Sequence, residues 1–113
     1  MTDEELVAIE TRANAATPGP WTWETDYEEE GGYFLDGPEG EDIGWARSEP
    51  DIIFISATRT AVPALITEVR RLRDALGDAI ELAEGGWLYA GDYFRNKWNF
   101  EAEVKALKEV LGE

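Results

Sequence analysis

The feature that most constrains the fold of this chain is a helical repeat of apolar residues near its middle. Six of them follow one another at spacings of 4, 3, 4, 3 and 4: Leu65, Val69, Leu72, Leu76, Ala79 and Ala83. Residues at these spacings lie on one face of an α-helix. Thr60 is a suitable N-cap with Pro63 in the first turn, and Gly85-Gly86 predicts a break or kink. We expect the rest of the chain to pack on or beside this helix.

Length and composition indicate one folded domain, residues 1–113. Hydrophobic residues make up 43% of the 113 positions and aromatic residues 12%, which argues against a disordered chain. The absence of cysteine excludes disulfides and thiol chemistry. No apolar run approaches the roughly eighteen residues of a membrane span, and no basic-then-apolar leader is visible. We therefore expect a soluble, cytoplasmic protein.

The charge of the chain is large, negative and uneven. Aspartate and glutamate number 25 against 10 lysine and arginine residues, which gives a net charge of −15. Residues 1–50 carry fourteen acids and two bases, whereas residues 51–113 carry eleven acids and eight bases. Such a surface repels nucleic acid and anionic membranes and attracts a protein with a basic surface. Direct binding to nucleic acid or to a membrane is therefore not expected.

The first part of the chain predicts a helix followed by a strand. Thr2 and Glu5 have the spacing of a capping box, and apolar residues then recur at helical spacing to about Ala16. Residues 17–20, TPGP, cannot continue a helix. In residues 21–28, tryptophan, threonine and tyrosine alternate with mostly acidic residues, which is the period of a half-buried strand.

Two further short strands complete a small sheet. Turn sequences rich in glycine precede a second strand that begins at Tyr33–Leu35 and a third that contains Ile43 and Trp45. The expected result is a three-stranded antiparallel meander with one apolar and one acidic face. So small a sheet needs a helix to cover it.

Two or three helices follow the sheet. Asp51 is a good N-cap for a short helix that ends near Ala57, after which Thr60 starts the long helix. Asn99 is the expected cap of the last helix, and residues 85–98 have no predicted structure. The apolar positions of that last helix recur at spacings of 4, 3 and 4: Phe100, Val104, Leu107 and Leu111. The fold class is α+β, with an N-terminal helix, the meander, and two or three helices around a long central amphipathic helix.

Several short segments of the chain together resemble a group of small phage and prophage proteins, many from actinobacteria, sometimes labelled Ead-like. They are AATPGPW at residues 15–21, FI at 54–55, and VPALI at 62–66 followed by the charged EVRRLR at 68–73. The resemblance covers about residues 1–76. It implies a phage or prophage setting inside a bacterial host cell, and it brings no agreed activity and no catalytic residue.

The residue types leave little room for catalysis. Without cysteine or histidine, Ser–His and Cys–His nucleophiles and histidine-based metal sites are excluded. Carboxylates remain as candidates for acid/base chemistry or cation binding: Asp36, Glu39, Glu41, Asp42, Glu81 and Glu84. The first four lack the spacing of an EF-hand loop, and the helical Glu81–Glu84 pair has no second acidic pair at suitable spacing. We interpret them as solvated acids and expect no enzymatic activity, metal or cofactor. A carboxylate, metal-dependent hydrolase is the least favoured alternative.

A dense group of acids in and around the sheet is the main candidate for partner binding. Its members are Glu24, Asp26, Glu28, Glu29, Glu30, Glu39, Glu41 and Asp42. One interpretation is an acidic face that keeps the protein soluble. The other is a surface that imitates nucleic-acid phosphate and occupies a basic groove of a host protein. The leading hypothesis is a non-enzymatic phage accessory protein that binds a host protein through this surface. In its sharper form, the protein inhibits a nucleic-acid-handling defence or transcription system.

Apolar side chains supply a different hypothesis. Aromatic residues at and beyond the end of the long helix are candidates for interface anchors: Trp87, Tyr89, Tyr93 and Trp98. Closing the end of the core is an equally good interpretation of them. The Leu65–Ala83 face is interpreted as core packing, with the seam of a homodimer as the alternative. If this face is the seam of a homodimer, the chain is a small structural or oligomerisation module that dimerises through its helices.

Overall fold

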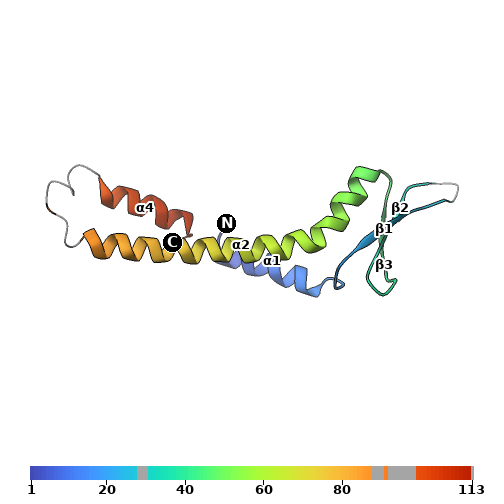
Figure 1. Cartoon of the computed structure of the whole chain (residues 1–113), viewed down its shortest axis with the longest axis horizontal. Coiled ribbons are helices and arrows are strands. Elements are labelled where there is room, and N and C mark those ends of the chain that lie inside the picture. The colour runs from blue at the N-terminus through green and yellow to red at the C-terminus, as the bar shows by residue number, and fades with distance from the viewer. Residues whose placement is uncertain (28–30, 88–90, 92–98, 113) are drawn as a thin grey trace. The chain divides into compact units, whose positions relative to one another are not determined.

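The computed structural model describes residues 1–27, 31–87, 91 and 99–112 and shows an α+β fold (Figure 1). Its elements are α1 (Asp3–Ala15), β1 (Thr22–Thr25), β2 (Tyr33–Asp36), β3 (Asp42–Ala46), α2 (Glu49–Trp87) and α4 (Phe100–Val110). This order of a helix, three strands and later helices confirms the predicted fold class. The residues group into two compact units: a terminal unit, Met1–Leu6 with Thr67–Glu113, and a central unit, Val7–Ile66. Each unit is described by itself.

Helix α1 begins at the predicted capping box. The Thr2 hydroxyl accepts the backbone N–H of Glu5 at 3.1 Å, and the Glu5 carboxylate accepts the backbone N–H of Thr2 at 3.4 Å. The two bonds satisfy donors that a helix start otherwise leaves free. The local sequence therefore predicts this helix start correctly.

In the central unit, the three strands form the predicted antiparallel meander, in the order β1-β2-β3. Thr25 pairs with Tyr33 across the first hairpin, and Tyr33 pairs with Ala46 across the second. The register of the second pairing shifts between Leu35 and Asp36.

Cross-strand pairing divides the side chains of the sheet between two faces. Trp23 and Tyr33 share the inner face, where their rings meet edge to face with centroids 5.5 Å apart. Glu24 pairs with Phe34, and Phe34 pairs with Trp45, so these three side chains share the other face, here called the outer face. The expectation of a purely acidic second face is therefore wrong, because two aromatic rings lie beside the acid.

The core of the central unit lies between the inner face of the sheet and the first turns of α2. Leu35, Ala46 and Ile52 are buried together. Ile52 is only 1% exposed and is the most enclosed side chain among the described residues. Partly buried side chains pack around this cluster: Trp21, Tyr33 and Ile43. Helix α2 thus provides the cover that so small a sheet requires.

The loop between α1 and β1 is attached to α2. The backbone carbonyl of Thr17 accepts a hydrogen bond from Trp21 Nε1 at 3.0 Å and another from Arg59 Nε at 2.8 Å. A Cβ atom added at Gly19 would lie 2.8 Å from Arg59 Cγ, so glycine permits this close approach. The ATPGPW segment therefore has a packing role within the central unit.

Helix α2 is continuous, so the predicted end near Ala57 and new start at Thr60 are wrong. The helix begins where the Ser48 hydroxyl accepts the N–H of Asp51 at 3.3 Å. Pro63 lies inside the helix, where it removes one backbone hydrogen bond without ending it. The Thr60-Pro63 signal of a helix start is overridden by the helix already formed before it.

The ends of the later helices differ from the prediction in two details. Gly85-Gly86 does not break α2, which continues to Trp87. Asn99 is the N-cap of α4 as predicted, but its side chain makes no capping hydrogen bond. Instead, its backbone has φ 44° and ψ 44°, and its carbonyl accepts the N–H of Glu103 at 3.3 Å.

In the terminal unit, α4 lies along the last turns of α2 (Figure 1). Lys108 forms an ion pair with Glu84 at 2.9 Å, and the rings of Trp87 and Phe100 stack with centroids 4.2 Å apart. Among the described residues of this unit, the buried apolar side chains are Leu6, Ile80 and Val104. These contacts hold the two helices together.

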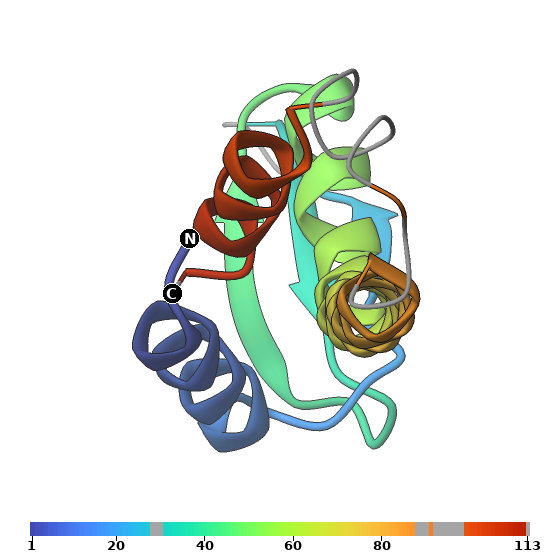
Figure 2. The same ribbon diagram turned by 90° about the vertical axis from the view of Figure 1, so that its left-hand side faces the viewer.

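The two ends of the chain lie side by side in the terminal unit (Figure 2). Arg73 of α2 donates to the Asp3 carboxylate at 2.7 Å and to the backbone carbonyl of Met1. Arg73 thus attaches the start of the chain to α2. Exposed ion pairs of this kind contribute little stability on their own, typically about 0–1 kcal/mol.

Helix α2 also contains a stretch that is long and apolar enough to cross a membrane, with no more than two charged residues. This stretch differs from the expectation that no apolar run approaches the length of a membrane span. The core helix of a soluble protein has the same length and composition, so this finding assigns no location to the protein.

Candidate functional site

The predicted acidic surface begins on β1. Glu24 is exposed on the outer face of the sheet. Asp26 follows the strand, is half-buried, and donates its backbone N–H to the carbonyl of Gly32 at 2.9 Å. Three further predicted acids lie outside the described residues: Glu28, Glu29 and Glu30.

The remaining predicted acids belong to the turn between β2 and β3. The Glu41 carboxylate accepts the backbone N–H of Glu39 at 2.6 Å, and the Glu41 carbonyl accepts the N–H of Gly37 at 2.9 Å. Glu41 therefore shapes the turn, whereas the side chains of Glu39 and Asp42 are exposed. Of the predicted acids that the structure describes, Glu24, Glu39 and Asp42 are thus exposed to a partner.

Two aspartates face each other across the second hairpin. Asp36 of β2 and Asp42 of β3 are paired residues at the register shift. The pairing places two acidic residues at the same end of the sheet. A basic partner that approached this end would be attracted to both carboxylates.

Aromatic residues complete the surface, and the sequence analysis did not assign them to it. Phe34 and Trp45 are 37% and 42% exposed and lie directly opposite each other on the outer face, in line with Glu24. Strict alternation around Leu35 would have placed Phe34 on the face opposite to the core. The pairing of Phe34 with Trp45 depends on the strand register, which sequence alone does not show.

Trp45 is held firmly in this position. Its indole Nε1 donates to the carbonyl of Gly31 at 3.2 Å, and its ring covers Gly32, where an added Cβ would lie 2.3 Å from the ring. A rigid ring loses little conformational entropy when a partner binds it. Trp45 is therefore suited to anchor an interface.

The predicted aromatic anchors lie mostly outside the described residues, namely Tyr89, Tyr93 and Trp98. Trp87 is half-buried and stacks on Phe100 at an interplanar angle of 16°. The structure thus shows Trp87 in a packing contact within the terminal unit.

The apolar repeat of α2 is more exposed than expected. In the central unit, Leu65 is 62% exposed, and in the terminal unit Leu72, Ala79 and Ala83 are exposed as well. Core packing of this face is therefore a wrong interpretation for these four residues. The helix is apolar on more than one face, and its buried residues lie off the repeat: Ile52, Ser56, Ile66 and Ile80.

Charges on α2 serve local contacts. Arg71 donates to Glu68 at 2.5 and 3.0 Å, and this hydrogen bonding lowers the pKa of the Glu68 carboxyl below its ordinary value. Both side chains are exposed, so solvent screens the pair. Among the residues that the structure describes, no three metal-ligating side chains converge.

The comparisons with known proteins add no relative. No family model, no curated protein and no solved structure matches this chain.

Proposed function

We propose that this chain is a non-enzymatic binding protein whose outer sheet face docks on a basic surface of a host protein, in a phage or prophage setting. The observation that carries the proposal is the cross-strand row of Glu24, Phe34 and Trp45. It places two exposed aromatic rings next to a carboxylate. Exposed aromatic anchors with a polar rim are typical of protein-binding surfaces.

Charge supports the same proposal. Residues 1–50, which include the whole sheet, carry fourteen acids against two bases. A field of this sign speeds the association of a basic partner and repels acidic ones. The paired residues Asp36 and Asp42 add two carboxylates to this field.

The resemblance of the first 76 residues to small phage proteins suggests which basic partner to test first. Proteins that handle nucleic acid carry basic grooves that receive phosphates. An acidic sheet face that occupied such a groove would inhibit a host defence or transcription protein.

Neutralising the exposed acids should weaken partner capture. The test variant carries Glu24→Gln, Glu39→Gln and Asp42→Asn. It should no longer retain a bacterial partner protein at about 50 mM salt and above, because the electrostatic attraction is removed. The unmodified protein should release the same partner only at higher salt. Mass spectrometry of the captured proteins at two salt concentrations measures both effects.

A matched control removes the same number of acids from a different surface. The control variant carries three substitutions at exposed positions of α2 in the terminal unit: Asp74→Asn, Asp78→Asn and Glu81→Gln. Capture should be nearly unchanged in this variant. Equal loss in both variants would mean that net charge alone attracts the partner, and it would contradict a site on the sheet.

Self-association through helices is the second candidate function. It is favoured by large apolar side chains that the terminal unit leaves exposed: Leu72, Leu82 and Val110. Leu82 is 79%, Val110 66% and Leu72 52% exposed. A second copy that packed against these side chains would bury them.

Leu72→Glu should convert such a dimer to a folded monomer, because a carboxylate would be buried in the seam. Sedimentation equilibrium at several concentrations measures the mass, and circular dichroism measures the helix content. Thr67→Glu is the control, since it adds the same charge to an exposed position about 140° away around the helix. A monomeric unmodified protein would remove this candidate.

A further inference from the structure

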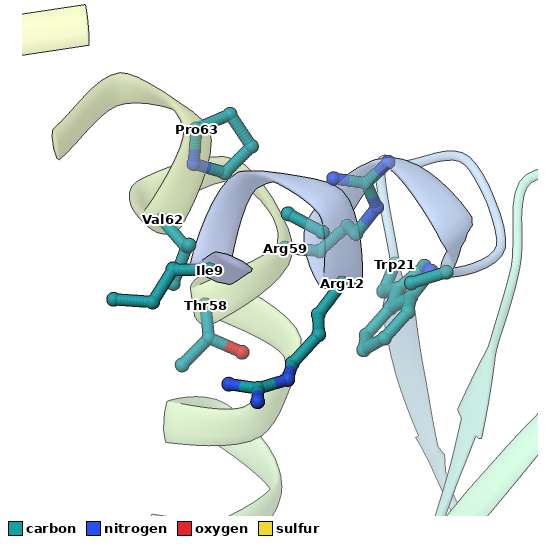
Figure 3. A pocket seen from close by; sticks show the side chains of 9 residues that line it. Ile9, Arg12, Trp21, Thr58, Arg59, Val62 and Pro63 are labelled. Atoms are coloured by element: carbon teal, nitrogen blue, oxygen red, sulfur yellow. The ribbon is translucent and has the colours of Figure 1, made fainter. Parts of the chain in front are cut away.

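A pocket of about 270 Å³ lies within the central unit, away from the outer face of the sheet (Figure 3). Helix α1, the ATPGPW loop and the middle of α2 each contribute to its wall. The lining residues are Ile9, Arg12, Ala13, Ala16, Trp21, Thr58, Arg59, Val62 and Pro63. The loop and the VP pair of the phage-like pattern therefore meet at one place.

The charge of this pocket is opposite to that of its surroundings. Residues 7–66 carry twelve acids but only three bases, Arg12, Arg47 and Arg59. Two of the three line the pocket, one from α1 and one from α2. No acidic side chain lines it. The pocket is thus a positive site within an acidic unit.

Both guanidinium groups have donors to offer. Arg59 uses Nε for the Thr17 carbonyl, which fixes the direction of its side chain, while its two terminal nitrogens make no hydrogen bond to the part of the chain that the structure describes. Arg12 likewise forms no ion pair or hydrogen bond within the described residues. Guanidinium groups of this kind bind carboxylates through two parallel hydrogen bonds.

Apart from Thr58, the rest of the wall is apolar. In the view of Figure 3, Ile9, Val62 and Pro63 lie to one side and Trp21 to the other, with the two arginines between them. An engineered cavity of about 150 Å³ holds benzene, so 270 Å³ accommodates on the order of ten non-hydrogen atoms. Inorganic phosphate would leave the apolar wall uncovered.

We propose that this pocket binds a small carboxylate with an apolar body, in which the carboxylate contacts Arg12 and the apolar body lies against Trp21, Val62 and Pro63. The charge and the apolar wall together define this class of ligand. The inference is independent of partner binding by the sheet, because none of the pocket residues lies on the outer face.

Phenylacetate is a suitable probe, with ten non-hydrogen atoms of its own. Its titration into ¹⁵N-labelled full-length protein should shift the NMR signal of the Trp21 indole N–H. The Trp21→Phe variant identifies this signal, because the signal is missing from its spectrum. We expect a Kd on the order of 1 mM for so small a ligand. Phenylacetamide lacks the charge and acetate lacks the apolar body, so each should bind at least about tenfold more weakly.

Arg12→Gln should weaken phenylacetate binding about tenfold, because a charge-assisted hydrogen bond is lost. Arg47→Gln is the matched control: it removes the third arginine of the same unit, which is exposed and does not line the pocket. Ala13→Leu fills the pocket from α1 and should abolish the shift of the Trp21 signal while the remaining spectrum stays folded.

Three results would overturn the proposal. The first is the absence of any Trp21 shift at 20 mM phenylacetate, and the second is an equal response to phenylacetamide. The third is a concentration-dependent mass that Arg12→Gln abolishes, because the two arginines would then bind acidic side chains of a second copy.

Discussion

Replacing Ile52 with alanine is expected to lower the free energy of unfolding by about 3 kcal/mol, which is the usual cost of deleting a large buried aliphatic side chain. Ile52 is 1% exposed and packs with Leu35 and Ala46, so it joins the first turns of α2 to the inner face of the sheet. The core of the central unit is small, and no other buried side chain of α2 belongs to this cluster. Urea unfolding followed by circular dichroism measures the change.

Ile53→Ala is the control for this prediction. It removes the same atoms from the next residue of the same helix, but Ile53 is 45% exposed. Its cost should stay below about 1 kcal/mol, since little apolar surface is returned to water. Equal losses in the two variants would contradict the position of α2 over the inner face.

Replacing Gly32 with alanine should be nearly as damaging, at about 2–3 kcal/mol, for two reasons. Gly32 has φ +93°, a conformation that costs alanine of the order of 1 kcal/mol or more. The added Cβ would also lie 2.3 Å from the Trp45 ring, so the indole must leave its position and its hydrogen bond to Gly31. Tryptophan fluorescence and thermal unfolding together measure this effect.

Gly31→Ala separates the two causes. Gly31 also has a positive φ, +66°, but an added Cβ would meet nothing within 4 Å. The free energy of unfolding of this variant should fall by about 1 kcal/mol or less, because the backbone of Gly31 is close to the left-handed region that other residues reach. Trp45 should keep its position. If Gly31→Ala and Gly32→Ala lost the same stability, contact between Trp45 and Gly32 would have no energetic role.

Elements with strong local signals are predictable from this sequence. The capping box at Thr2 and Glu5 and the alternation after Trp21 are contained in a few neighbouring residues, and the structure has a helix and a strand at these places. Asn99 is also the predicted cap, although its backbone rather than its side chain makes the bond.

Local signals did not predict that the long helix runs without a break. Thr60 and Pro63 together form a good helix start, yet the helix already begins at Glu49, after Ser48. One proline is tolerated when packing holds the helix on both sides of it. Gly85-Gly86 lies in the last turn of α2, where a lower helix propensity costs little.

The candidate site was predictable only in part. The acids of the sheet are visible in the composition, and Glu24, Glu39 and Asp42 are indeed exposed. The aromatic pair depends on strand register, because Phe34 and Trp45 are eleven positions apart in the sequence and meet only through the pairing of two strands.

The helix repeat shows a second limit of sequence reasoning. A helix with apolar residues on more than one side offers several faces, and the sequence does not show which one the fold buries. In α2 the buried positions include Ile66 and Ile80, while Leu65 and Leu72 of the repeat are exposed.

The measurement that tests the proposed function most directly is partner capture by two matched phenylalanine variants. Phe34→Ser removes an aromatic ring from the outer face of the sheet, and Phe54→Ser removes one from α2, where it is 71% exposed. Capture should fall at least about tenfold with Phe34→Ser, the loss typical of a binding hot spot, and stay unchanged with Phe54→Ser. If the Phe34→Ser variant still captured the partner and the Phe54→Ser variant did not, the partner would bind α2. That result would contradict the proposal that the outer face of the sheet is the binding surface.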